Sequence, residues 1–259
     1  MAHRPRLRLR ITCVSDFACP WCALGLRRLD DAVAELEAAG DVVPGSSRER
    51  TWVPYPLRRG RRAPDEGVAK RESYVKRLGQ DGFDRMVRRL EEEGARSGMR
   101  FDFSSAAVLG HTLDAHRLVA WVRDGGGERE RLVRELFRAH SELGRNLAER
   151  GVLRACAARA RLAASPAEID AFLYADAEAG RVAVEREMAR VASEMGFVSG
   201  VPHYSFELLD ADDTLAREPL RVTAVSGAQD PEYFRLILRR AVERAREAAE
   251  ERRKKPAML

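Results

Sequence analysis

The stretch Ile11-Thr12-Cys13-Val14-Ser15-Asp16-Phe17-Ala18-Cys19-Pro20-Trp21-Cys22 decides how the rest of this sequence is interpreted. An apolar, strand-like run leads into two cysteines that are two residues apart, and an amphipathic helical pattern follows. The first turn of a helix can hold such a pair close enough to form a disulfide, and its free N–H groups favour a thiolate. The stretch therefore predicts a thiol–disulfide redox site at a strand-to-helix turn.

The segments around the cysteine pair show strand and helix patterns in a fixed order. Residues 6–14 alternate basic and apolar side chains, which predicts a strand, and apolar residues at helical spacing then run to Gly40. Residues 50–57 predict a second strand, and residues 68–195 are helical in pattern almost throughout. Strands are predicted at 203–209 and 220–225, and Asp230-Pro231-Glu232 begins a final helix. The charged tail from Arg244 is expected to fray.

This order predicts an α/β protein with a thioredoxin fold, β-α-β followed by β-β-α, and a large all-helical insertion between the two halves. The predicted boundaries are 1–62 for the N-terminal half with the cysteine pair, 63–196 for the insertion, 197–245 for the C-terminal half and 246–259 for a charged tail.

Composition excludes several other classes of protein. The chain has 46 basic and 41 acidic residues and a formal charge of +5, and no motif or basic-aromatic stripe indicates a nucleic-acid partner. No segment approaches the roughly 18 apolar residues of a membrane span. The basic N-terminus is not followed by the apolar run of a signal peptide, so a cytoplasmic location is expected. Four cysteines are too few for a disulfide scaffold.

Neither a metal nor a nucleotide is expected as a cofactor. A four-thiolate zinc site needs a second C-x-x-C pair, and the sequence has only one. A P-loop and a Gly-x-Gly-x-x-Gly fingerprint after a strand are also missing from the sequence. The expected redox centre is therefore a disulfide between Cys19 and Cys22.

Several short motifs, in their order and spacing, resemble the DsbA family of thioredoxin-fold oxidoreductases and within it the FrnE-like subgroup. They are Ser15-Asp16 before Cys19-Pro20-Trp21-Cys22, Gly25 with Arg27-Arg28-Leu29, Asp114-Ala115-His116-Arg117-Leu118, Gly200-Val201-Pro202 and Val225-Ser226-Gly227-Ala228-Gln229. The same architecture is similar to kappa-class glutathione transferases and 2-hydroxychromene-2-carboxylate isomerases, which typically have Ser at the position of Cys19 and lack the second cysteine.

The four residues of the cysteine motif have separate expected roles. Cys19 is expected to be the exposed nucleophile, and Cys22, one turn into the helix, the more buried resolving thiol. Pro20 suits the first helical turn because its missing N–H would be unpaired there, and Trp21 offers an apolar surface beside the sulfur. The alternative is that the two cysteines form half of a zinc site or are inert core residues. Cys13 and Cys156 are expected to be structural.

The segment Gly200-Val201-Pro202 is the second expected element of the site. The resemblance implies a cis bond before Pro202 and a position facing the cysteine pair, where the Val201 backbone pairs with an extended substrate. An ordinary proline at the start of a strand is the alternative. His203 either stabilises the thiolate through a positive charge or occupies a strand surface.

Two further candidates are Asp16, which precedes the cysteine motif, and His116 of the segment Asp114-Ala115-His116-Arg117-Leu118. Asp16 either caps the helix, relays the proton of Cys22, or is a simple loop residue. His116 is expected to be a satisfied core group, but the resemblance also allows a substrate-facing role.

The leading functional prediction is a protein disulfide oxidoreductase that exchanges disulfides through Cys19 and Cys22. Its partners would be protein or small-molecule thiols and disulfides, with glutathione as a candidate co-substrate and a monomer or homodimer as its assembly. One alternative is a glutathione-dependent isomerase or transferase of the related type. Another is a non-catalytic holdase or partner-binding module in which the cysteine pair is a regulatory switch.

Overall fold

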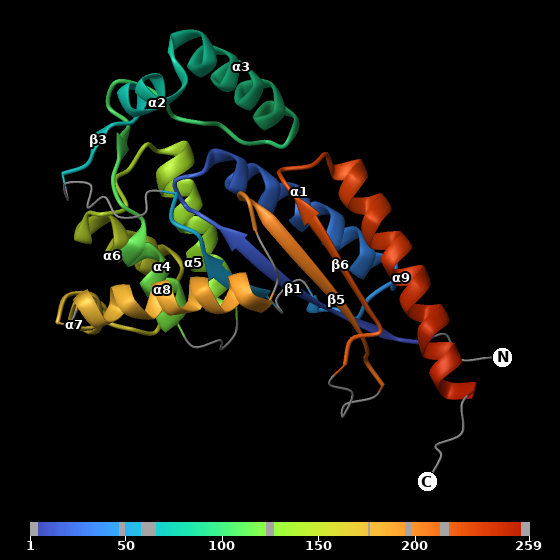
Figure 1. The fold of residues 1–259 in the computed structure, drawn as a ribbon. Helices are drawn as coiled ribbons and strands as arrows, with labels where there is room; N and C mark the ends of the chain where they lie inside the picture. Colours follow the sequence, from blue (N-terminus) through green and yellow to red (C-terminus); the bar gives the residue numbers. More distant parts are fainter. Residues whose placement is uncertain are drawn as a thin grey trace. The chain divides into compact units, whose positions relative to one another are not determined.

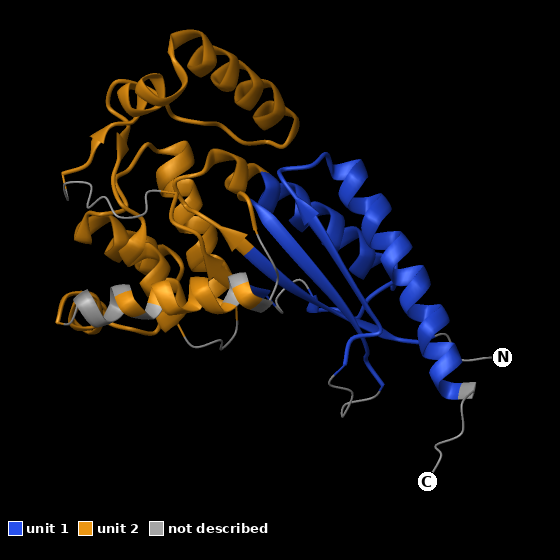
Figure 2. Ribbon diagram, viewed as in Figure 1, with its two compact units in different colours: residues 1–13, 25–51, 202–259 blue, residues 14–24, 52–201 orange. Residues whose placement is uncertain are grey.

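The structure, a computed structural model, describes residues 5–46, 50–57, 66–122, 127–175, 177–194, 198–212 and 218–254. Contacts divide the chain into two compact units, which Figure 2 colours separately. Unit 1 comprises residues 1–13, 25–51 and 202–259, and unit 2 comprises residues 14–24 and 52–201. By its contacts, the segment with the cysteine pair thus groups with the inserted residues rather than with the rest of the helix that it begins.

Unit 1 is built on a sheet with the strand order β2-β1-β5-β6 (Figure 1). The strands are β1 (Leu7–Ser15), β2 (Arg50–Pro54), β5 (His203–Asp210) and β6 (Arg221–Ser226), and the last residues of β1 and β2 belong to unit 2. β5 and β6 are antiparallel. In β1, Leu7, Leu9 and Ile11 are buried while Arg10 is exposed, which confirms the strand predicted from the period of two.

The helices of unit 1 are most of α1 (Pro20–Ala38) and the long α9 (Pro231–Lys254). The predicted apolar face of α1 is buried at Leu26, Leu29, Val33 and Leu36. Buried Arg28 of α1 donates hydrogen bonds from Nη1 to the carbonyl oxygens of Ala228 and Gln229, at 3.0 and 3.3 Å. The loop before α9 is therefore held to α1 by a guanidinium group.

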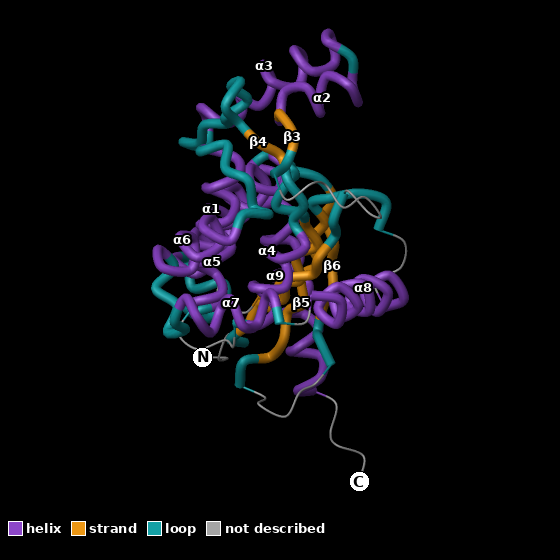
Figure 3. Tube along the Cα trace, turned by 90° about the vertical axis from the view of Figure 1, so that its left-hand side faces the viewer, coloured by secondary structure: helices purple, strands orange, loops and turns teal. Residues whose placement is uncertain are grey.

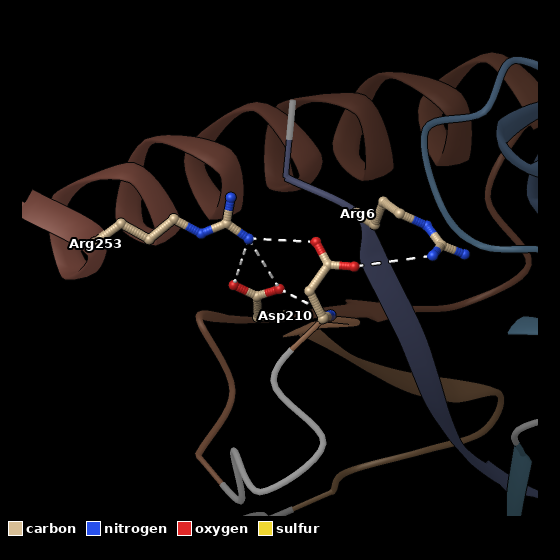
Figure 4. A network of polar contacts seen from close by, with 4 residues as sticks. Arg6, Asp210 and Arg253 are labelled. Atoms are coloured by element: carbon tan, nitrogen blue, oxygen red, sulfur yellow. Dashed lines mark hydrogen bonds and ion pairs between the residues drawn. The ribbon is translucent and has the colours of Figure 1, made fainter. Parts of the chain in front are cut away.

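The expectation that the chain frays from Arg244 is wrong as far as Lys254, because α9 continues to that residue. Ala245 and Ala249 are fully buried along this part of the helix. Near its end, Arg253 binds Asp210 and Asp212, and Asp212 also pairs with Arg6 at 3.8 Å (Figure 4). Apolar contacts and ion pairs thus hold a segment that looks like a charged tail, and residues 255–259 lie outside the described residues.

Unit 2 contains the predicted helical insertion. Its helices are α2 (Lys70–Leu78), α3 (Gln80–Arg96), α4 (Leu113–Trp121), α5 (Glu128–Phe137), a π-helical turn η2 (Arg138–Glu142), α6 (Arg150–Arg159), α7 (Pro166–Tyr174) and α8 (Ala177–Glu194). The predicted start of α7 is confirmed, because Ser165 and Glu168 form a reciprocal capping box.

The sequence does not predict two short strands within the insertion, β3 (Val68–Ala69) and β4 (Val108–Leu109). They pair antiparallel, with Val68 opposite Leu109, and lie near α2 (Figure 3). Two residues are too few to show a period of two, so only the folded chain reveals this ladder.

A cluster of aromatic and aliphatic side chains joins α2 and α3 to the start of α1. Its buried members are Ala18, Tyr74, Phe83, Leu90, Phe103 and Leu109, and its partly buried members are Trp21, Val75, Met86, Val87 and Phe101. We call this set the aromatic cluster. Because Ala18 and Trp21 belong to it, the insertion packs directly against the cysteine motif.

Candidate active site

Cys19 occupies the turn between β1 and α1. Its N–H donates to the Asp16 carbonyl oxygen at 3.0 Å, and its own carbonyl accepts the N–H of Cys22 at 3.0 Å. The helix begins at Pro20, which confirms the predicted proline in the first turn. Cys19 therefore lies at the positive end of the helix, where a thiolate is favoured.

Both sulfurs of the motif are buried, so the prediction that Cys19 is exposed is wrong. Cys19 has 5% of its surface exposed and Cys22 has 1%, so Cys22 is the deeper of the two, as predicted. The Cys19 thiol lies 3.9 Å from the carbonyl oxygen of Val201. The Val201 side chain packs with Val14 and Val53.

The two thiols have opposite pKa displacements. A hydrogen bond from the Cys22 thiol is the largest cause of a lowered pKa at Cys19, and the N–H groups of Cys22 and Trp21 also lower it, against burial and the charge of Asp16. Burial raises the pKa of Cys22 well above its usual value, and the Cys19 sulfur raises it further. All four cysteines of the chain are free thiols in this structure. One thiol of the pair is thus prepared to ionise while its neighbour keeps its proton.

Asp16 is the buried centre of a hydrogen-bond network. Its Oδ1 accepts from the hydroxyl of Thr112 at 2.7 Å and the N–H of Ala18 at 3.3 Å, and lies 3.4 Å from Nε2 of His116. Its Oδ2 accepts the N–H of Leu57 at 2.8 Å. The side chain bonds an N–H ahead of the helix and residues from the insertion, so Asp16 does more than occupy a loop.

The Asp16 carboxyl is held ionised although it is buried. Burial would raise its pKa, but the hydrogen bond and charge of His116, the Leu57 N–H and the Thr112 hydroxyl together place the pKa below its usual value. A buried negative charge therefore lies beside the two thiols, and it raises the pKa of both.

His116 is a core residue, as its apolar surroundings in the sequence predict. Its side chain is buried, faces Asp16, and stacks at a tilt on Phe17 with 4.7 Å between ring centroids. His116 is thus a buried partner for the carboxylate, and the substrate-facing role that the family resemblance allows stays a prediction.

Pro202 and His203 belong to unit 1. Pro202 is buried, and its carbonyl accepts the N–H of Gly227 at 2.8 Å. His203 begins β5, and its Nδ1 lies 2.8 Å from the hydroxyl of Ser226 on β6. Burial lowers the pKa of His203, which works against the positive charge expected there. A cis bond at Pro202 and contacts of both residues with substrate stay predictions.

Cys13 and Cys156 are buried, in agreement with the structural roles expected for them. The Cys156 thiol donates to the carbonyl of Glu135 at 3.7 Å, and burial raises its pKa to about 12. A thiol that keeps its proton at neutral pH is a poor nucleophile.

Sequence reasoning missed the site residues that come from the insertion. The Tyr74 hydroxyl donates to the Ala18 carbonyl at 3.1 Å, Thr112 binds Asp16, and the Arg89 guanidinium lies 5.2 Å from the ring centroid of Trp21. Tyr74 is 56 positions from Ala18, and Thr112 is 96 positions from Asp16. No local pattern connects residues so far apart, although the buried Tyr74 lies beside a recognisable helical stripe.

The described residues also bear on metal binding and on membrane spans. Among the described residues, no three His, Cys, Asp or Glu side chains lie where they could hold a metal ion. Likewise, none of the described helices combines the length and the apolar composition that crossing a membrane requires.

The sheet order, the helical insertion and the paired thiols at the start of α1 define a thioredoxin-like α/β protein. The chain belongs to the DSBA-like thioredoxin domain family, whose model matches residues 10–239. This confirms the predicted fold and family, and the chain thus has the fold of DsbA-like thiol oxidoreductases. The FrnE-like subgroup stays a prediction.

Solved structures of related proteins agree with this assignment. A probable DsbA oxidoreductase from Streptomyces coelicolor is 26% identical with a TM-score of 0.70, over 97% of this chain and 94% of that one. The cytosolic disulfide reductase DsbM from Pseudomonas aeruginosa, solved with GSH, is 19% identical with a TM-score of 0.52, over 90% and 99%. A 2-hydroxychromene-2-carboxylate isomerase is 13% identical with a TM-score of 0.55, over 93% and 98%. No curated protein sequence matches the chain significantly.

Proposed function

We propose that this protein is a disulfide oxidoreductase that exchanges disulfides through Cys19 and Cys22. The observation that carries the proposal is the asymmetry of the pair. The pKa of Cys19 is lowered by the hydrogen bond from Cys22, and the pKa of Cys22 is raised by burial. Dithiol exchange needs this arrangement, with one sulfur ionised for attack and the other held back until the first has reacted.

The reaction proceeds in two balanced steps. The Cys19 thiolate attacks one sulfur of the substrate disulfide, forms a mixed disulfide, and expels the second substrate sulfur as a thiolate that takes a proton from solvent. Cys22 then gives up its proton and attacks the Cys19 sulfur of the mixed disulfide. This closes the Cys19–Cys22 disulfide and releases the substrate sulfur that was bonded to Cys19, as a thiolate. Two electrons pass from the protein dithiol to the substrate disulfide, and the reverse sequence oxidises a substrate dithiol.

The remaining site residues have supporting roles in this proposal. Asp16 controls the Cys22 proton, because its charge raises the pKa of that thiol from within the buried network. Pro20 starts the helix, Trp21 offers an apolar surface, and Val201 and Pro202 bind an extended substrate. The required redox centre is the protein's own disulfide, and glutathione is a candidate co-substrate. A cytosolic location is part of the proposal, and DsbM, which shares the fold, is a cytosolic protein.

The proposal is tested by equilibrium titration of the protein in glutathione buffers, followed by Trp fluorescence and by the number of free thiols at Cys19 and Cys22. A reversible two-electron transition is expected. A midpoint near about −270 mV would identify a reductant, and one near about −120 mV an oxidant. If both thiols stay reduced and glutathione binds intact, the oxidoreductase is excluded and the glutathione-dependent isomerase or transferase is favoured.

Replacing Asp16 by Asn should lower the pKa of Cys19, because the carboxylate charge raises that pKa in the wild type. The midpoint of the pH profile for iodoacetamide alkylation of Cys19 should therefore move to lower pH. The matched control is Thr112→Val, which removes a hydrogen bond of 2.7 Å to Asp16 but leaves the charge in place. A fall of the midpoint in both variants, or in neither, would contradict an electrostatic role for Asp16.

A further inference from the structure

Two aromatic rings flank Cys19, and an arginine stacks on each. The Tyr74 hydroxyl bonds the carbonyl of Ala18, the residue before Cys19, and the guanidinium carbon of Arg77 lies 4.9 Å from the Tyr74 ring centroid. Trp21, two residues after Cys19, packs in the aromatic cluster, and Arg89 lies 5.2 Å from its ring centroid. Stacking on a ring orients a guanidinium while leaving its N–H edge available.

Arg77 and Arg89 differ from Arg85 and Arg88 of the same region in that each lies over a ring that belongs to the cysteine motif or is bonded to the residue before it. Both Arg77 and Arg89 are exposed, and within the described residues neither has a hydrogen-bond acceptor or an acidic partner. By contrast, Arg96 on the same helix as Arg89 pairs with Glu93 at 3.4 Å, and Arg117 pairs with Asp114 at 2.9 Å. Two guanidinium groups, one over a ring bonded to Ala18 and one over Trp21 of the motif itself, thus keep their donors available for a ligand.

A neighbouring pocket has a different character. Arg71 stacks on Phe83 of the same cluster at 4.9 Å and lines, with Arg88, a pocket of about 410 Å³. Three carboxylates also line that pocket, those of Asp84, Glu91 and Asp102. Because these acids oppose the binding of an anion, Arg71 and Arg88 are not part of the surface inferred from Arg77 and Arg89.

We propose that Arg77 and Arg89 form an anion-binding surface that selects peptide disulfides with acidic residues next to the cysteine. A carboxylate on either side of the reacting sulfur would meet a guanidinium held over Tyr74 or Trp21 and bind through paired N–H donors. This substrate preference rests on the proposed disulfide exchange at Cys19, and Arg77 and Arg89 act as specificity-determining residues for it.

The test uses three matched peptides in which one cysteine, in a mixed disulfide with a chromogenic thiol, is flanked by Asp, Asn or Lys. Reduced protein is mixed with each peptide, and the second-order rate constant for release of the chromogenic thiol is measured at low and high salt. We expect the Asp peptide to react about three- to tenfold faster than the Asn peptide at low salt, as two partly exposed ion pairs would provide, and the Lys peptide to react slowest. In the double variant Arg77→Gln/Arg89→Gln the ratio of Asp to Asn rates should fall to about one.

The matched control is Arg85→Gln/Arg88→Gln, which removes the same charge from the insertion without touching either stacked pair. It should keep the Asp preference. Equal loss of the preference in both double variants would show that the overall positive charge of the insertion causes it, and this would overturn the proposal. Retention of the preference in Arg77→Gln/Arg89→Gln would overturn the proposal as well. Either result leaves disulfide exchange standing if the Asn peptide reacts.

Failure of the wild type with the Asn peptide would instead contradict the proposed exchange. The surface is then judged by binding alone, from the fluorescence anisotropy of a labelled Asp peptide with Ala in place of its cysteine. Binding that is weakened by Arg77→Gln/Arg89→Gln and not by Arg85→Gln/Arg88→Gln would support the surface. No binding, or equal weakening in the two, would overturn it.

Discussion

Replacing Cys19 by Ser is expected to abolish disulfide exchange, with a loss of roughly a thousandfold or more because a serine hydroxyl stays protonated at neutral pH and cannot form the mixed disulfide. Replacing Cys22 should have a different effect. The first attack still takes place, but nothing resolves its product, so the mixed disulfide between Cys19 and substrate should accumulate. Mass spectrometry of the protein after mixing with a disulfide substrate measures that adduct directly.

Two substitutions of Cys22 separate its hydrogen bond from its role as resolving thiol. Neither Ser nor Ala can resolve the mixed disulfide, but only Ser keeps a donor toward the Cys19 sulfur. Because the Cys22 hydrogen bond is the largest cause of the lowered Cys19 pKa, the alkylation midpoint of Cys19 should lie at higher pH in Cys22→Ala than in Cys22→Ser. Equal midpoints would show that the helix start alone activates Cys19, and turnover by Cys19→Ser would exclude the proposed mechanism.

Acid should destabilise the protein through His140. This histidine lies in η2, is fully buried, and has a pKa lowered by burial from 6.5 to about 3, with the nearby charge of Lys70 also lowering it. In the unfolded chain it takes up a proton below about pH 6.5, but in the folded chain it does not. The free energy of unfolding therefore falls as pH falls below 6.5, by about 1.4 kcal/mol per pH unit. Between pH 7.5 and pH 5 this residue alone should cost about 2 kcal/mol.

Urea unfolding of the wild type and of His140→Asn at pH 5 to 8 measures this contribution. The Asn side chain can keep the contact that Nδ1 makes with the Arg145 carbonyl at 3.3 Å, but it does not titrate. The difference in unfolding free energy between the two proteins should shrink by about 2 kcal/mol as pH falls to 5. The control His203→Asn should change the pH slope less, because His203 is only half-buried. Parallel curves for wild type and His140→Asn would refute the assignment.

Lys70 should act in the alkaline range. Its ammonium group donates to the His140 carbonyl at 3.0 Å, and burial lowers its pKa from 10.5 to about 8. Between these values the unfolded chain binds more protons than the folded chain, so the Lys70 contribution makes stability rise from pH 8 toward pH 10.5. Neither this buried pair nor its pH dependence is visible in the sequence, where Lys70 is simply a charged residue within a stretch of helical pattern.

The parts of the fold that the sequence predicts correctly are those with local signals. Alternation in β1, the apolar stripe of α1, the proline at its start and the Ser165 capping box each depend on residues a few positions apart. The prediction that the tail frays is wrong because the contacts that hold it are made with residues far away in the sequence. Its charges look solvated in sequence, but Arg253 reaches Asp210 across 43 positions.

By itself, the sequence determined the chemistry of the site: two cysteines one helical turn apart, at a strand-to-helix turn where the backbone favours a thiolate. The tertiary structure decided how that chemistry is controlled. It buries the Cys19 sulfur against Val201, gives the Asp16 carboxylate its partners Thr112 and His116, and brings Arg89 onto Trp21. These contacts join residues far apart in the chain, and only packing of the inserted helices on the cysteine motif brings such residues together.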